Sequence, residues 1–204
     1  MFFSFDGIDG AGKSTQIALL ADWLRAGGKE VVTCRDPGST PLGEKLRGLL
    51  LEHHGTSIHR RSEMLMYMAA RAQLVEEVIR PALAAGKCVI SDRYLLANVV
   101  YQAHAGGLSP EEVWQVGQVT VAGIMPRLTF ILDLPASSAA ARFNRAPDRM
   151  EAQGLEYMER VRQGFLLEAA KRPEGIVVID ATATAEVVHL QVIDAIEKHR
   201  KAND

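Results

Sequence analysis

Short apolar runs alternate along the chain with longer stretches in which apolar residues recur every three or four positions. The short runs predict five buried strands, at 2–6, 30–35, 87–92, 127–134 and 176–180. The longer stretches predict helices at 13–26, 41–53, 62–85, 110–124, 155–171 and 185–198. Strands that alternate with helices predict an α/β fold, a five-stranded parallel sheet with helices on both faces.

Glycine and proline residues at the ends of the predicted elements support these boundaries, and nothing in the sequence divides the chain into separate domains. Gly27-Gly28 and Gly86 stand just before predicted strands, where helices commonly end, and Ser109-Pro110 opens a helix with two acids in its first turn. No repeat, low-complexity run or Pro/Gly/Ser linker separates parts of the 204 residues. We therefore expect a single domain over 1–204, with one polar, arginine-rich interruption at 142–153 that predicts a short lid.

Composition and charge narrow the classes of function. Apolar residues make up 48% and charged residues 24%, which disfavours disorder and coiled coils. Lys and Arg number 23 against 25 Asp and Glu, so the formal charge is −2. This near balance gives no general attraction for polyanions, and we expect neither nucleic acid nor membrane as a partner.

Cellular location is suggested by what the sequence lacks. No run approaches the roughly 20 apolar residues of a membrane span, and the first six residues do not resemble a signal peptide. Two cysteines, Cys34 and Cys88, both lie in apolar runs and favour buried, reduced thiols. A cytoplasmic location is the expectation.

The first predicted strand leads directly into a G-x-x-x-x-G-K-S phosphate loop. In such a loop the backbone N–H groups and the start of the following helix surround a phosphate chain. Lys13 is expected to contact the β- and γ-phosphates, and Ser14 to ligate Mg²⁺. The residues expected to bind ATP here are Gly7, Ile8, Asp9, Gly10, Ala11, Gly12, Lys13, Ser14 and Thr15.

A second carboxylate follows the third predicted strand. Asp92 ends this apolar strand and matches the second magnesium element of P-loop proteins, although aspartate is also common in ordinary turns. Arg93 beside it is a candidate for bidentate phosphate contacts.

Four segments together resemble the bacterial thymidylate kinases over nearly the whole chain. They are the phosphate loop at 5–16, the stretch R-D-P-G-S-T-P-L-G-E at 35–44, A-A-R-A-Q at 69–73, and D-R-Y with Y-Q between 92 and 102. The resemblance implies a P-loop nucleoside monophosphate kinase that transfers a phosphoryl group from MgATP to dTMP and gives dTDP and ADP for dTTP synthesis.

The resemblance also implies roles for residues around the acceptor phosphate and sugar. Asp9 resembles a carboxylate near the deoxyribose 3′-hydroxyl and the magnesium shell. Asp36 stands where the family usually has Glu, so its shorter arm is expected to reach the sugar or metal through water. Arg47 and Arg93 resemble arginines that hold the acceptor phosphate in line for transfer.

Base recognition is expected from one helix and from the segment after the third strand. Tyr67 and Arg71 are four residues apart and share a helical face, although Tyr67 next to methionines is also typical of a packed core. Tyr101 is expected to crowd the 2′-carbon and disfavour ribonucleotides. The residues that the resemblance assigns to the base and sugar are Tyr67, Arg71, Asn98, Tyr101 and Gln102.

The lid is expected to supply arginines that the phosphate loop lacks. Arg142, Arg145 and Arg149 have i, i+3, i+7 spacing, which predicts one helical face. We expect Arg145 or Arg149 to reach the transferred phosphoryl group and Arg142 to lie over the adenine. With the other basic site residues, they predict positive charge concentrated in one cleft and acids on the outside.

Two alternatives remain open from the sequence. Ala97 and Val100 replace the Ser and Ala usual in the family, which leaves room for a P-loop kinase of another nucleoside monophosphate or of a deoxynucleoside. The second alternative is a nucleotide-dependent switch that has no acceptor substrate. Family members are commonly homodimers, and the predicted helices at 62–85 and 110–124 are candidates for the interface.

Overall fold

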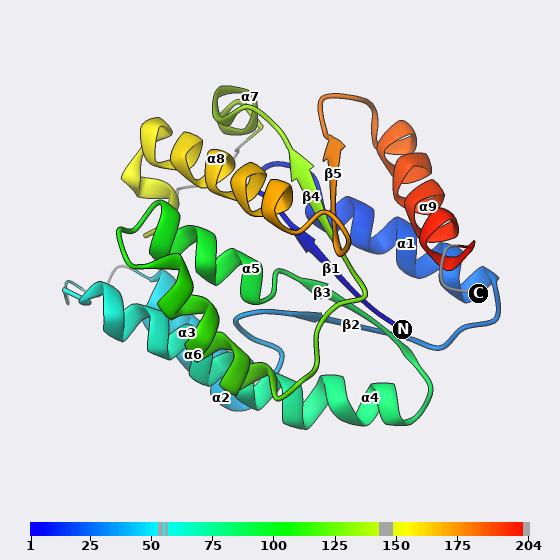
Figure 1. Cartoon of the computed structure of the whole chain (residues 1–204), viewed down its shortest axis with the longest axis horizontal. Helices are drawn as coiled ribbons and strands as arrows, with labels where there is room; N and C mark the ends of the chain where they lie inside the picture. Colours follow the sequence, from blue (N-terminus) through cyan, green and yellow to red (C-terminus); the bar gives the residue numbers. More distant parts are fainter. Residues whose placement is uncertain (53–54, 56, 143–148, 202–204) are drawn as a thin grey trace.

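The sheet has the five parallel strands that the sequence predicts. The structure is a computed structural model, and it describes residues 1–52, 55, 57–142 and 149–201. Its strands are β1 (Phe2–Asp6), β2 (Val31–Arg35), β3 (Cys88–Asp92), β4 (Leu128–Asp133) and β5 (Ile176–Asp180). All neighbouring strands pair in parallel in the order β2-β3-β1-β4-β5 (Figure 1). The predicted five-stranded parallel α/β fold is confirmed.

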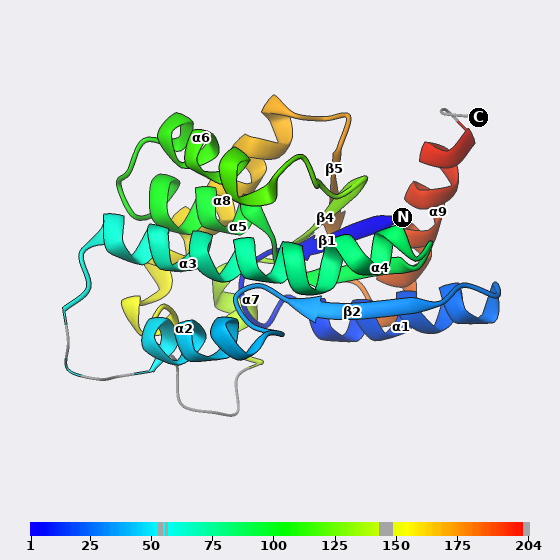
Figure 2. The same cartoon turned by 90° about the horizontal axis from the view of Figure 1, so that it is seen from below.

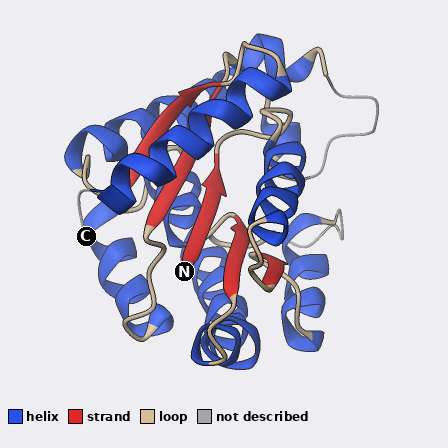
Figure 3. Ribbon diagram, turned by 90° about the vertical axis from the view of Figure 1, so that its right-hand side faces the viewer, coloured by secondary structure: helices blue, strands red, loops and turns tan. Residues whose placement is uncertain are grey.

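Helices cover both faces of this sheet (Figures 2 and 3). On one face, α1 (Lys13–Ala26) packs against α9 (Ala185–Lys201). The other face carries α3 (Arg60–Leu74), α4 (Arg80–Ala84), α5 (Leu95–Asn98), α6 (Pro110–Val121) and α8 (Leu155–Lys171). The remaining α-helices are α2 (Pro41–Leu51), which packs on α3, and the short α7 (Ala136–Ala140).

Alternation along β1 builds the core on both sides of the sheet, since successive side chains point to opposite faces. Phe5 lies against Phe130 of β4 with ring centroids 5.0 Å apart. Phe2 meets Tyr94 edge to face at 5.1 Å, among the helices of the opposite face. Buried aromatic pairs on both faces therefore fix the strand from which the phosphate loop departs.

Besides the short α7, for which no helix was predicted, the structure differs from the predicted helices at two π-helical turns. The single helix expected at 62–85 is interrupted by a π-helical turn, η1 (Val75–Ile79), before α4. Pro81 lies in the first turn of α4 and has no N–H for the helical ladder, so the turn before it widens. The second π-helical turn, η2 (Val99–His104), continues α5 in a stretch for which we predicted no helix. Its Val and Tyr residues favour strands locally, but burial against α6 and α8 keeps it helical.

The carboxyl ends of the parallel strands place the candidate chemistry at one edge of the sheet. β1 ends at the phosphate loop, β2 at Asp36, and β3 at Asp92 and Arg93. Asp36 N–H donates to the carbonyl of Asp92 at 3.0 Å, and Arg93 N–H donates to that of Phe5 at 2.9 Å. These backbone bonds hold the three strand ends side by side. Among the described helices, none is both long and apolar enough to cross a membrane.

Candidate active site

The phosphate loop has a backbone that requires glycine at two points. Gly7 has φ 128° and Gly10 has φ 82°, conformations that other residues rarely adopt. A Cβ on Gly7 would lie 2.6 Å from the Leu132 carbonyl oxygen, and one on Gly10 would lie 2.8 Å from that of Ala139. The loop therefore packs tightly on the end of β4 and on α7, and it ends at the N-terminus of α1, which favours an anion.

Lys13 lies inside this loop. Its Nζ donates to the carbonyl oxygens of Gly7 at 3.3 Å and Ile8 at 3.0 Å, and to Asp9 Oδ1 at 3.3 Å. The side chain is buried, so its charge is held at the loop rather than in solvent. Lys13 thus lies inside the phosphate loop, and its contact with the phosphate chain stays a prediction.

Arg93 connects the end of β3 to the same loop. Its guanidinium donates to the Gly7 carbonyl at 2.9 Å and to Asp9 Oδ1 at 2.6 Å, and its backbone has the unusual φ of 67°. Burial opposes ionisation of Asp9, but Arg93 and Lys13 hold the pKa of its carboxyl well below the usual range. Asp9 is therefore a carboxylate held between two cations at the entrance to the loop.

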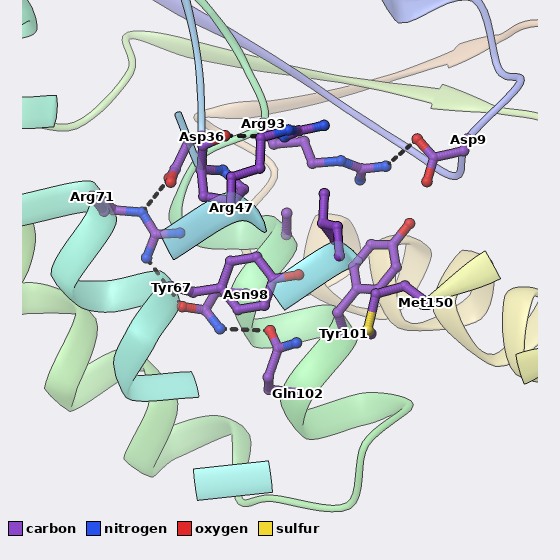
Figure 4. Close-up of a pocket in the computed structure, with 13 residues that line it drawn as sticks. Asp9, Asp36, Arg47, Tyr67, Arg71, Arg93, Asn98, Tyr101, Gln102 and Met150 are labelled. Carbon is purple, nitrogen blue, oxygen red and sulfur yellow. Dashed lines mark hydrogen bonds and ion pairs between the residues drawn. The ribbon is translucent and has the colours of Figure 1, made fainter. Parts of the chain in front are cut away.

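A pocket opens beside Arg93 and brings together all nine residues predicted to bind the acceptor nucleotide (Figure 4). They come from the phosphate loop, the segment after β2, α2, α3, the end of β3, α5 and η2. The full lining is Asp9, Asp36, Pro37, Arg47, Leu51, Tyr67, Arg71, Arg93, Ala97, Asn98, Tyr101, Gln102 and Met150. Tyr67 thus lines this pocket, as the functional interpretation required.

Buried polar side chains run along one wall of the pocket. Arg71 Nε donates to Asp36 Oδ2 at 2.5 Å, and Arg71 Nη1 donates to Asn98 Oδ1 at 3.2 Å. Asn98 Nδ2 in turn donates to Gln102 Oε1 at 2.6 Å. Burial raises the pKa of Asp36, and the Arg71 guanidinium acts against this shift. The wall therefore presents a charged pair followed by two amides, a set able to read the polar edge of a base.

The start of α2 positions Arg47. Thr40 caps the helix by accepting from Gly43 N–H at 2.9 Å, and Glu44 accepts from Ser39 N–H at 2.7 Å. Arg47, two turns on, donates to the Pro37 carbonyl at 3.0 Å, and burial lowers its pKa. The capped turn thus aims a partly desolvated guanidinium into the pocket, where an anion would be strongly attracted.

The oxygens available for magnesium fit an ion that takes few protein ligands. Asp92 Oδ1 is buried with no hydrogen-bond partner among the described residues, and the Ser14 side chain is exposed at the start of α1. Within the described ranges no three His, Cys, Asp or Glu side chains gather into a metal-holding group. One carboxylate and one hydroxyl suit Mg²⁺, which completes its octahedron with water and phosphate oxygens.

The described lid arginines bind different parts of the site. Arg142 donates to the Gly10 carbonyl at 3.2 Å, beside the phosphate loop. Arg149 donates to the Leu50 carbonyl at 2.6 Å and to the buried Glu63. Both residues lie in turns, so the prediction that they share one helical face is wrong. Arg145 falls outside the described residues.

Sequence reasoning missed several residues of the site. Glu63 is fully buried and bonds Arg60, Gln102 and Arg149, which contradicts the expectation that the acids lie outside. Asp6 is also fully buried, and neither of its carboxylate oxygens has a hydrogen-bond partner among the described residues. A signal for Glu63 was present, because positions 63, 67 and 71 form one stripe along a helix.

Comparisons with known proteins agree with this geometry. The thymidylate kinase family model matches residues 5–192. A thymidylate kinase of Rhodopirellula baltica is 47% identical over 194 residues, covering 95% of this chain and 78% of that protein. One of Kosmotoga olearia is 43% identical over 195 residues, covering 95% and 93%. The crystal structure of thymidylate kinase from Ehrlichia chaffeensis gives a TM-score of 0.78 at 33% identity, covering 96% of this chain and 98% of that one. This chain belongs to the thymidylate kinase family.

Proposed function

We propose how the residues of this chain carry out the reaction of its family. The chain is a nucleoside monophosphate kinase that uses ATP with Mg²⁺ and converts dTMP to dTDP, releasing ADP. One observation carries the proposal for the residues: Arg93 both lines the acceptor pocket and bonds the phosphate loop through Gly7 and Asp9. The two substrates would therefore meet at this guanidinium.

On the donor side, the backbone of residues 7–15 holds the ATP phosphates and Lys13 neutralises the β- and γ-phosphates. Ser14 and Asp92 hold Mg²⁺, directly or through water, and the bound ion supplies charge neutralisation on the phosphates. Arg142 closes over the nucleotide from the lid, which its contact with the Gly10 carbonyl supports.

On the acceptor side, Arg47 and Arg93 grip the phosphate of dTMP. Their guanidiniums come from α2 and from the end of β3, so they approach one anion from two directions. Asp9 and Asp36 face the sugar, and Tyr101 lies against the 2′-carbon. Holding the acceptor oxygen in line with the γ-phosphate supplies most of the catalysis in such a transfer.

The base of dTMP lies between Tyr67 and the polar wall. Tyr67 stacks on the thymine ring, while Arg71, Asn98 and Gln102 bond its polar edge. Ala97 replaces a hydroxyl residue with a methyl group at the pocket wall, so recognition here relies on the amides and on Arg71.

The lid segment at 142–153 belongs to the same single domain, 1–204. Arg145 and Arg149 are its candidates for the transferred phosphoryl group. Arg149 is bound by Glu63 on the acceptor side, which favours Arg145 for direct contact and Arg149 for closing the acceptor pocket. Closure of such a lid excludes water and so favours transfer over hydrolysis.

The assembly we propose is a homodimer that works in the cytoplasm, without nucleic acid or membrane partners. Its interface is formed by α3 and α6, which pack together and leave Leu65 and Val119 exposed. Val119 is 80% exposed, the highest value among the exposed large hydrophobic residues described. A near-balanced net charge of −2 supports the absence of polyanion partners.

Phosphorus NMR of the reaction mixture tests the proposed reaction. With the protein, MgATP and dTMP, we expect the resonances of ADP and dTDP to grow together while those of ATP and dTMP decline. Release of inorganic phosphate at the same rate with and without dTMP would contradict transfer to the acceptor.

A further inference from the structure

Glu63 occupies an unusual place for a carboxylate. It lies in the first turn of α3, is fully buried, and lies beyond the lining of the acceptor pocket. Gln102 Nε2 donates to Glu63 Oε1 at 3.0 Å, Arg60 Nη1 donates to the same oxygen at 3.2 Å, and Arg149 donates to Oε2. Three donors thus converge on the two oxygens of Glu63, and the side chain acts only as an acceptor in these bonds.

A continuous chain of hydrogen bonds connects Glu63 with the other end of the pocket wall. From Gln102 the chain passes to Asn98, from Asn98 to Arg71, and from Arg71 to Asp36. Figure 4 shows the part from Asp36 to Gln102 along the pocket. The members lie on the segment after β2, on α3, α5 and η2, and the far end meets the lid segment at Arg149.

The two ends of this chain determine the orientation of both amides between them. Arg71 can only donate, so Asn98 must turn its carbonyl oxygen toward Arg71 and its NH₂ toward Gln102. Glu63 can only accept, so Gln102 must turn its NH₂ toward Glu63 and its carbonyl oxygen toward Asn98. Reversing either amide would set donor against donor or acceptor against acceptor in a buried site, which is costly.

We propose that Glu63 is a positioning residue of the acceptor site, which fixes the orientation of the Gln102 and Asn98 amides that face the base and ties them to Arg149 of the lid segment. The proposal rests on the function proposed above. It explains why a carboxylate lies buried behind the pocket: Gln102 and Arg149 both donate to position 63, and a carboxylate has an acceptor oxygen for each. Glu63 acts through Gln102 and does not itself contact the substrate.

The substitution Glu63→Gln tests this most directly because it keeps the shape and removes the charge. The introduced amide has one acceptor end and one donor end, while Arg149 and Gln102 both need acceptors. If that amide accepts from Arg149, its NH₂ group faces the NH₂ group of Gln102, so two donors meet. Turning Gln102 and then Asn98 only moves this clash of donors along the hydrogen bonds to Arg71. We expect the KM for dTMP to rise about tenfold, the cost of one lost hydrogen bond to a charged group, with the KM for ATP unchanged.

The matched control is Glu168→Gln. Glu168 is also buried and accepts from Trp114 Nε1 at 2.9 Å and from Arg172, but it lies on α8, outside this chain of bonds. Both variants lose a buried carboxylate, so both are expected to melt at a lower temperature. Only Glu63→Gln is expected to change the KM for dTMP. Equal effects of the two variants on this KM would overturn the proposal.

A double exchange gives a readout that does not depend on activity. Gln102→Glu alone places two carboxylates side by side and is expected to lower the Tm. In the double variant E63Q/Q102E, the amide now at position 63 can accept from Arg149 and donate to the carboxylate now at position 102. That carboxylate can accept from Asn98, so the links from Arg149 through positions 63 and 102 to Asn98 are restored, and only the bond from Arg60 is lost. The double variant is expected to melt above the sum of the two single effects. Strictly additive changes in Tm would contradict the relay, that is, the proposed chain of hydrogen bonds from Glu63 through Gln102, Asn98 and Arg71 to Asp36.

These outcomes are separable from failure of the proposed reaction. If the wild-type protein shows no dTMP-dependent ADP release, the proposed reaction is wrong. The Tm values of the single and double variants would still test the proposed hydrogen-bond relay. An active wild type whose dTMP KM is unchanged by Glu63→Gln would overturn the relay and leave the reaction standing.

Discussion

Arg93 donates to Asp9 Oδ1 at 2.6 Å and thereby joins the end of β3 to the loop that follows β1. The same guanidinium lies 5.0 Å from the ring centroid of Tyr101, beneath the proposed sugar position. One planar side chain thus touches the phosphate loop, the proposed acceptor pocket and Tyr101, the residue proposed to exclude ribonucleotides. The adjoining halves of the site are fixed relative to each other by this contact.

Replacing Arg93 with lysine should uncouple the two halves. A lysine ammonium is a compact charge that cannot reproduce the fork reaching both Gly7 and Asp9. We expect kcat/KM for dTMP to fall about 100-fold, as when one preorganised donor is lost. Initial rates at saturating ATP measure this. Arg80→Lys, at an exposed arginine paired with Glu76 on the neighbouring turn, is the control and should retain full activity. A similar loss in both variants would contradict the assignment.

Asp6 should make the stability of the nucleotide-free protein depend on pH. Burial raises its pKa to about 7, whereas an unfolded Asp ionises near about 3.9. Between these values the folded state holds a proton that the unfolded state has lost, so stability falls as pH rises through this interval, by at most about 4 kcal/mol. Thermal melts from pH 5 to 8 should show a clearly steeper decline for wild type than for Asp6→Asn. If the Tm of both proteins falls equally with pH, the pKa of Asp6 is not raised.

Arg71 should contribute to stability as well as to dTMP binding. Arg71→Met leaves the buried Asp36 without its partner at 2.5 Å, and we expect the free energy of unfolding to drop by about 3–5 kcal/mol. The double variant R71M/D36N removes the stranded charge and should recover most of that loss in denaturant unfolding. Its KM for dTMP should remain high. Recovery of both quantities would remove Arg71 from base recognition.

The proposed dimer can be tested on α6. Val119→Glu places a charge in the middle of the proposed interface, and we expect sedimentation velocity to change from a dimer to a monomer. Val187→Glu is the control, since Val187 is an exposed valine on α9, on the other face of the sheet. A wild-type protein that sediments as a monomer would contradict the dimer.

The framework of the fold could be predicted from sequence because its signals are local. Strand β1 is a short apolar run that ends at a glycine loop, and α1 follows that loop directly, so both were predicted with the bounds the structure has. The helical segment Leu95–His104 could not be predicted, since valine and tyrosine favour strands and only tertiary burial makes these residues helical.

Nine of the residues that line the proposed acceptor pocket could also be predicted, because they stand in motifs that match the family. The motifs did not reveal how these residues are paired with one another. The buried Glu63 pairs with Arg149, whereas we expected the acids outside the predicted site to lie on the surface, and the pairing of Asp36 with Arg71 was not predicted either. Pairing of this kind depends on which helices lie side by side, and no local pattern in the sequence encodes that.

The preference of this protein for dTMP can be measured as ADP release with a panel of acceptors. MgATP is held constant, and dTMP, dUMP, UMP, CMP, AMP and GMP are supplied in turn in a coupled assay. We expect the highest kcat/KM with dTMP, a lower value with dUMP, and little activity with the four ribonucleotides. A preference for AMP or GMP, or ADP release that no acceptor changes, would contradict it.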